Sequence, residues 1–169
     1  MKFLRSAALT VLFAVVLSGS AGAQSNTATS SCNATATIVT GISIAKASDL
    51  NFGSVVPGGS AGTVVMTPAG ARTAAGGTSL GSATGSSAGA FQVSGLGGAT
   101  YSITLPASTT ITSGGNNMTV NTFTSTPNAT GTLNGGGNQI LAIGATLQVG
   151  ASQPTGTYTG SFNVTVTYN

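Results

Sequence analysis

Charged side chains are almost missing from this sequence. Its 169 residues include four Lys or Arg, one acidic residue and no His, so 3% of the chain is charged, against about 25% in an ordinary globular domain. General acid–base catalysis needs His, Glu or Asp beside a reacting group, and Asp49 is the one acid present. Zinc and calcium sites need clusters of Cys, His or carboxylates. We therefore expect no enzyme, no cofactor and no metal site.

Basic patches, Trp and paired cysteines are missing as well. The net charge of +3 reflects the shortage of acids, and four scattered cations cannot neutralise several phosphates, so we expect no nucleic-acid binding. Cys32 is the single cysteine, which excludes an internal disulfide even in an oxidising compartment. The absence of a Cys–Trp–Cys pattern excludes an antibody-type domain.

The first 23 residues have the pattern of a secretory signal peptide. Lys2 and Arg5 precede an uncharged apolar run over residues 7–17, and Ala21-Gly22-Ala23 supplies the small residues of a cleavage site. The run is shorter than the roughly 20 apolar residues that span a bilayer. We predict that residues 1–23 are removed and that the exported chain, from residue 24 on, has no integral membrane segment.

The remaining sequence favours β-strands. Thr, Ser, Gly, Asn, Val and Ala dominate, whereas Leu and Lys are scarce and Glu is absent, a composition that disfavours helices. Gly- and Pro-rich turns, such as Pro57-Gly58-Gly59 and residues 114–117, separate short apolar stretches. Residues 70–88 show little pattern, so we expect mostly loop there, with a solvated Arg72. Many short strands predict an all-β sandwich or barrel.

The last predicted strand, residues 158–168, shows the strictest alternation. Its even-numbered residues are apolar apart from Gly160, and its odd-numbered residues are all polar. Such a period of two predicts that one face of the strand is buried. The apolar face consists of Tyr158, Phe162, Val164, Val166 and Tyr168.

Four segments of the sequence resemble a secreted bacterial β-domain family of unassigned function, over residues 33–169. The segments are Leu50-Asn51-Phe52-Gly53, Tyr101-Ser102-Ile103-Thr104-Leu105-Pro106, Ile143-Gly144-Ala145-Thr146-Leu147 and Gly156 through Tyr168. The last segment also resembles the structural subunits of archaic chaperone–usher pili. Those subunits share a penultimate Tyr, here Tyr168, a Gly at the fourteenth position from the end, here Gly156, and an alternating final strand.

The resemblance to pilus subunits implies an immunoglobulin-like β-sandwich that lacks one strand. A periplasmic chaperone would fill the resulting groove first. The N-terminal extension of the next subunit would later replace the chaperone, with an outer-membrane usher as the second assembly partner. The sandwich would span residues 38–169 and the donated extension residues 24–37. The acceptor edge would consist of Gly156, Tyr158, Phe162, Val164, Val166 and Tyr168, and the candidate donor residues are Ala34, Ala36 and Ile38.

These features together predict an exported, pilin-like structural subunit that polymerises by donor-strand exchange at the cell surface. Two features depart from the pilus pattern: the disulfide that links the first strands of many pilins is impossible here, and Ala34 and Ala36 are small for residues that plug a groove. One alternative is a self-contained secreted or surface β-sandwich binding module whose first and last strands pair. A second is a small outer-membrane β-barrel, which the aromatic content of 5% disfavours. Lys46 and Asp49 are expected to form a solvated ion pair.

Overall fold

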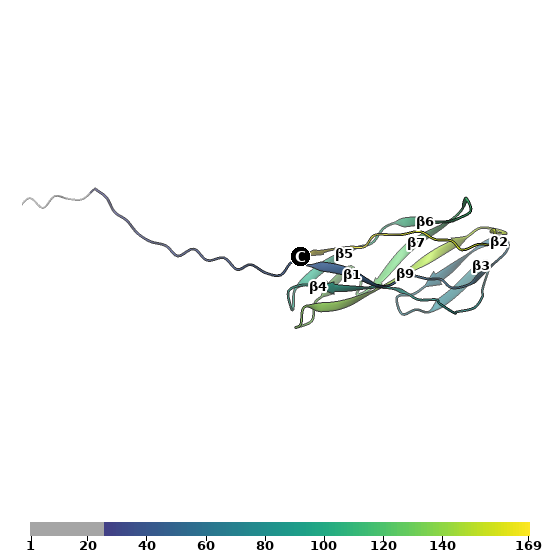
Figure 1. Ribbon diagram of the computed structural model, residues 1–169, viewed down its shortest axis with the longest axis horizontal. Coiled ribbons are helices and arrows are strands. Elements are labelled where there is room, and N and C mark those ends of the chain that lie inside the picture. Colours follow the sequence, from purple (N-terminus) through teal and green to yellow (C-terminus); the bar gives the residue numbers. More distant parts are fainter. Residues whose placement is uncertain (1–25) are drawn as a thin grey trace, which may run out of the picture. The chain divides into compact units, whose positions relative to one another are not determined.

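The computed structural model describes residues 26–169, and the predicted signal peptide lies outside the described residues. Residues 38–169 form one compact unit, which does not include the described residues before Ile38. Within the described residues, the regular elements of this unit are ten strands (Figure 1). The described part of the chain contains no helix of the length and apolarity needed to cross a membrane.

The strands form two antiparallel sheets, which confirms the predicted all-β sandwich. The larger sheet has the order β1-β4-β9-β2-β3, in which β4 and β2 pair with different parts of β9 along one edge. Along its other edge β9 pairs with β7, and β7 pairs with β6. The smaller sheet has the order β10-β5-β8. The bounds are β1 (Ser43–Ser48), β2 (Val55–Met66), β3 (Arg72–Leu80), β4 (Gly89–Ser94), β5 (Thr100–Thr104), β6 (Ser108–Ser113), β7 (Asn116–Thr126), β8 (Thr130–Thr132), β9 (Asn138–Val149) and β10 (Thr165–Tyr168).

Two segments that we predicted as breaks belong to the long β2–β3 hairpin. Strand β2 continues through Pro57-Gly58-Gly59, and β3 occupies much of the predicted loop at residues 70–88. A register shift after Pro57 absorbs the irregular residues, and pairing resumes at Gly62 opposite Gly76. The middle of β2 and most of β3 contain few large side chains and are held by backbone pairing, so hydrophobic alternation could not reveal these parts.

The core divides into two halves that share Phe123. The first core half consists of buried Phe52, Val64, Met66, Val120, Ala145, Leu147 and Val149. The second consists of buried Val93, Tyr101, Leu133, Leu141 and Ile143. Phe123 packs against both because the β7–β9 register shifts between Asn121 and Thr124, with Thr122 at a φ of 48°. This irregularity turns an odd-numbered side chain inward on a strand whose earlier core residues are even-numbered.

The predicted final strand pairs regularly only over β10, which lies beside β5. Upstream, the C-terminal segment is held to β6 by one bridge, Thr112 opposite Thr159, and by a hydrogen bond from the Thr109 hydroxyl to the backbone oxygen of Ser161 at 2.7 Å. The predicted alternation in burial is confirmed, because the apolar even-numbered side chains are half-buried and the odd-numbered ones are exposed.

Candidate functional site: an apolar groove between two sheet edges

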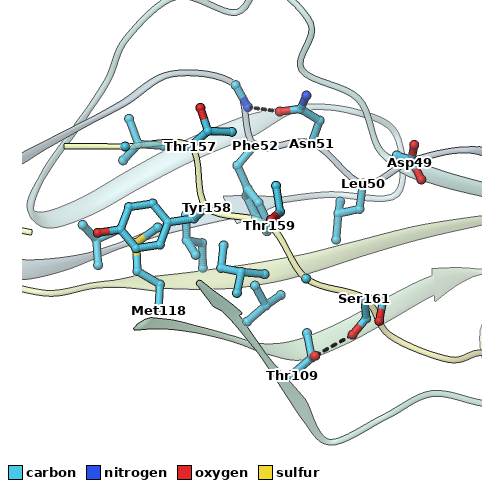
Figure 2. A pocket seen from close by; sticks show the side chains of 18 of the residues that line it. Asp49, Leu50, Asn51, Phe52, Thr109, Met118, Thr157, Tyr158, Thr159 and Ser161 are labelled. Atoms are coloured by element: carbon cyan, nitrogen blue, oxygen red, sulfur yellow. Dashed lines mark hydrogen bonds between the residues drawn. The ribbon is translucent and has the colours of Figure 1, made fainter. Parts of the chain in front are cut away.

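A groove of about 850 Å³ opens between two stretches of chain (Figure 2). Residues 46–57 form one wall, here the N-terminal wall, and residues 153–162 form the other, here the C-terminal wall. The floor belongs to the first core half and its neighbours on β6, β7 and β9. It consists of Ile111, Met118, Val120, Leu147 and Val149.

Each wall continues into the edge strand of a sheet. Strand β1 is the end strand of the larger sheet and β10 is the end strand of the smaller one, so neither has a second pairing partner among the described strands. The backbone N–H and oxygen of Thr159 both bond to Thr112, at 3.0 and 2.9 Å. Since neighbouring residues of an extended segment direct their backbone groups to opposite sides, the N–H and C=O groups of Tyr158 and Gly160 point away from β6.

The sandwich is closed at one end and open at the other. In the second core half, Ile42 and Ile44 from the β1 side and Val166 and Tyr168 from β10 pack on the same buried cluster. The first core half contains no described side chain from residues 153–168. Consequently, four side chains that pack against this half and line the groove are only partly buried. They are Leu50, Val55, Ile111 and Met118.

Tyr158 and Phe162 fix the C-terminal wall. The Tyr158 hydroxyl donates to the backbone oxygen of Pro154 at 2.8 Å and accepts from Gln153 Nε2 at 2.9 Å. The Phe162 ring lies 4.9 Å from the ring of Phe123 and 6.4 Å from that of Phe91, centroid to centroid. Such ring pairs are favourable beyond the area that they bury, so this wall keeps its course although little regular pairing supports it.

Gly156 and Gly160 allow the C-terminal wall to approach β6 closely. A Cβ on Gly156 would collide with the hydroxyl of Ser113, and a Cβ on Gly160 would lie 2.5 Å from the backbone oxygen of Thr110 and 3.0 Å from Ile111 Cγ2. The position of the wall therefore depends on two residues without side chains.

The N-terminal wall depends on Arg72, which is not solvated as we predicted. Its Nη1 donates to the backbone oxygens of Phe52 at 2.6 Å and Ser54 at 3.4 Å, and its Nη2 donates to that of Gly81 at 3.3 Å. These bonds tie the wall to both ends of β3 and hold the segment from which Phe52 enters the core. The prediction was wrong because the carbonyl groups that bind the guanidinium come from segments far from Arg72 in the sequence.

The groove carries almost no charge. Lys46 and Asp49 are the charged residues of its described lining, and they pair with each other at 2.7 Å, with side chains that are 60% and 78% exposed. This confirms the predicted solvated pair. Apart from this pair, the described lining consists of uncharged side chains, both apolar and polar.

A family model described as DUF4402, a domain of unknown function, matches residues 42–168. The chain belongs to the DUF4402 family. The family of unassigned function that the four sequence segments resemble is thus confirmed. No curated protein and no solved structure matches the chain. The DUF4402 match includes both walls and the floor of the groove, whereas residues 26–41 precede it.

In the DUF4402 domain, the predicted acceptor residues differ in whether they line the groove. Gly156, Tyr158 and Phe162 line the groove. Val164, Val166 and Tyr168 do not line it and pack against the second core half, as Phe162 also does. The candidate donor residues Ala34, Ala36 and Ile38 precede the matched region and are exposed, Ile38 by 98%.

The groove also contains residues that we did not predict. They come mainly from the N-terminal wall and the floor: Leu50, Phe52, Val55, Ile111, Met118, Leu147 and Val149. The sequence shows that these residues are apolar, and that some of them, such as Ile111 and Met118, have polar neighbours on both sides. Which of them face an open part of the core depends on the register among β2, β6, β7 and β9, and a single sequence carries no signal for that register.

Proposed function

We propose that this protein is an exported, pilin-like structural subunit that polymerises at the cell surface through a β-strand donated into the groove. The observation that carries the proposal is the pair of unpaired edges, beside β1 and along residues 158–162, which flank one apolar floor. A strand placed between them would pair with exposed backbone groups and would cover the partly buried floor.

The energetics of the groove favour an occupant. Ile111 and Met118 on the floor and Leu50 on the N-terminal wall are partly exposed, and covering apolar surface stabilises by about 25 cal/mol per Å². The C-terminal wall also lacks the charged residues that ordinarily protect an edge from unwanted pairing, since residues 153–168 contain no Lys, Arg, Asp or Glu. A partner that covers this edge would remove both problems.

The route to the surface forms part of the proposal. Export would depend on the signal peptide, residues 1–23, and the groove would be occupied by a periplasmic chaperone until an outer-membrane usher exchanges it for the next subunit. The support for this route is the C-terminal pattern from Gly156 to Tyr168 together with a groove bordered by that segment.

A gel of protein sheared from cells, run in SDS with and without boiling, tests the proposal. Strand-exchanged polymers should survive SDS and give a ladder that collapses to one band on boiling. Phe162→Asp, which places a charge in the aromatic contact with Phe91 and Phe123, should abolish the ladder. Asn163→Asp, on the exposed face of the same segment, is the matched control and should retain it. A single monomer band in both lanes for the wild type contradicts the proposal.

One observation favours a second candidate, a self-contained surface β-sandwich that binds its target as a monomer. The Tyr168 hydroxyl donates to the backbone oxygen of Thr40 at 3.0 Å, and Ile42 and Ile44 share the second core half with Val166. The first and last segments of the domain thus already meet at one end. This candidate predicts that deletion of residues 24–37 leaves a soluble monomer with unchanged melting temperature, unchanged target binding and no loss of any assembly.

A further inference from the structure

The turn that joins β8 to β9 contains an Asn–Gly pair, Asn134-Gly135. Wherever another asparagine of the sequence is followed by a residue, that residue has a side chain. The space around Gly135 is open, because a Cβ built there would meet no atom within 4 Å. A glycine nitrogen is the least hindered backbone nitrogen that a chain offers, so the Gly135 nitrogen can approach the side-chain amide of Asn134.

Solvent reaches both groups of this pair. Asn134, Gly135 and Gly136 are exposed, so hydroxide can remove the Gly135 proton and water can hydrolyse a product. Among the described residues, the N–H of Gly135 has no hydrogen-bond acceptor, whereas that of Gly137 donates to the backbone oxygen of Asn134 at 2.8 Å. The Gly135 nitrogen is therefore free to lose its proton and to act as a nucleophile.

The turn also polarises the amide that this nitrogen would attack. The N–H of Asn138 donates to Asn134 Oδ1 at 3.0 Å. Asn138 is itself held in place, because its Nδ2 donates to the backbone oxygen of Gly136 at 2.9 Å and its Oδ1 accepts from the Ser94 hydroxyl at 2.9 Å. A fixed donor at a carbonyl oxygen stabilises the negative charge that develops there when a nucleophile adds to the carbon.

We propose that Asn134 is a self-modifying residue, which deamidates through attack by the Gly135 nitrogen. The bond from this nitrogen to Asn134 Cγ forms and the bond from Cγ to Nδ2 breaks. Nδ2 leaves as ammonia, and the proton that it gains balances the one lost from Gly135. The product is a cyclic imide. Water that adds at Cγ opens it to aspartate, and water that adds at the main-chain carbonyl carbon of residue 134 opens it to isoaspartate.

The modification changes the closed end of the sandwich with time. Each event adds a carboxylate to a chain in which Asp49 is the one acid. Aspartate keeps an acceptor for the N–H of Asn138, whereas isoaspartate lengthens the main chain within the turn. This lengthening displaces the backbone oxygen of residue 134, which accepts from Gly98 at 3.2 Å and from Gly137 at 2.8 Å. Isoaspartate therefore loosens the contact between this turn and the loop after β4.

Incubation of the folded wild-type protein at mildly alkaline pH, followed by peptide mass spectrometry, tests the proposal. Asn134 should become an acid at least tenfold faster than Asn128 and Asn163, which are also exposed but precede Ala and Val. Gly135→Ala should slow the conversion at least tenfold, and its melting temperature should equal that of the wild type because the added methyl group has open space. A rate at Asn134 equal to that at Asn128 and Asn163, or unchanged by Gly135→Ala, overturns the proposal.

The rate in the unfolded chain separates the contribution of the turn from that of the Asn–Gly pair. Urea removes the hydrogen bond from Asn138 to Asn134 Oδ1, so the folded protein should convert Asn134 at least as fast as the wild type unfolded in urea. A folded rate tenfold below the unfolded rate would show that the turn protects Asn134, and the proposal would fail. Both measurements use the single chain, so their outcome does not depend on whether the protein polymerises.

Discussion

The hydroxyl of Tyr168 donates a hydrogen bond to the backbone oxygen of Thr40 at 3.0 Å. The same hydroxyl accepts the N–H of Leu96 at 2.6 Å, so one phenol connects the last strand, the approach to β1 and the loop after β4. These contacts lie at the closed end of the sandwich, where β1 and β10 contribute to one core half. They hold together the two edge strands that diverge towards the groove.

Tyr168→Phe removes this connection and leaves the ring in place. We expect the free energy of unfolding to fall by about 1 kcal/mol, because the N–H of Leu96 and the oxygen of Thr40 lose a partner. Urea denaturation monitored by circular dichroism measures the change. Thr165→Ser, on the exposed face of the same strand, should alter the unfolding free energy by less than about 0.5 kcal/mol. Equal effects of the two substitutions would contradict a role for the hydroxyl.

Gly160→Ala should disturb the C-terminal wall. A methyl group at this position would press on the backbone oxygen of Thr110 and on Ile111, and overpacking of this kind costs about 1–3 kcal/mol. Thermal unfolding should show a lowered melting temperature, and SDS-resistant polymer should decrease as well. The control is Gly135→Ala, because a Cβ there would have open space around it. An unchanged melting temperature for Gly160→Ala would show that the wall can move away from β6 without cost.

Arg72→Met should destabilise the domain although it removes no ion pair. The guanidinium bonds to three backbone oxygens, those of Phe52, Ser54 and Gly81, and hydrogen bonds from charged donors contribute about 1.5–3 kcal/mol each when buried. As Arg72 is only half-buried, we expect a total loss of about 2 kcal/mol in urea titrations. Lys46→Met, which breaks the exposed pair with Asp49, should cost at most about 1 kcal/mol. A larger effect at Lys46 than at Arg72 would refute this assignment.

Alkaline pH should destabilise the domain through Tyr101. Burial raises the pKa of the Tyr101 phenol above its ordinary value of 10.0, and its hydroxyl donates to Gln139 Oε1 at 2.8 Å. Above pH 10 the unfolded chain loses this proton while the folded chain retains it, so the contribution of Tyr101 to stability is full below pH 10 and declines above it. Melting temperatures between pH 8 and 12 measure the decline. The decline should be smaller in Tyr101→Phe, and an equal decline would assign the effect to other groups.

Several elements of the fold could be predicted from the sequence because local chemistry determines them. The turn at Gly114 and Gly115, both with positive φ, joins β6 and β7 where two consecutive glycines favour a tight hairpin. The alternating apolar and polar residues of the C-terminal segment predict its half-buried face.

Other elements depended on contacts between distant residues. The inward turn of Phe123 depends on an irregularity in β7 opposite β9, and the strand at residues 72–80 depends on its pairing with β2. The binding of Arg72 to three carbonyl groups depends on loops that the fold brings together.

By itself, the sequence determined that this chain forms strands, that its core is apolar and uncharged, and which face of the final segment is buried. Those properties follow from side-chain composition and from a period of two along the chain. Only the tertiary structure decided that the two edge strands meet at one end and leave a groove at the other. That outcome depends on register and sheet order, which are set by the combined packing of residues far apart in the sequence.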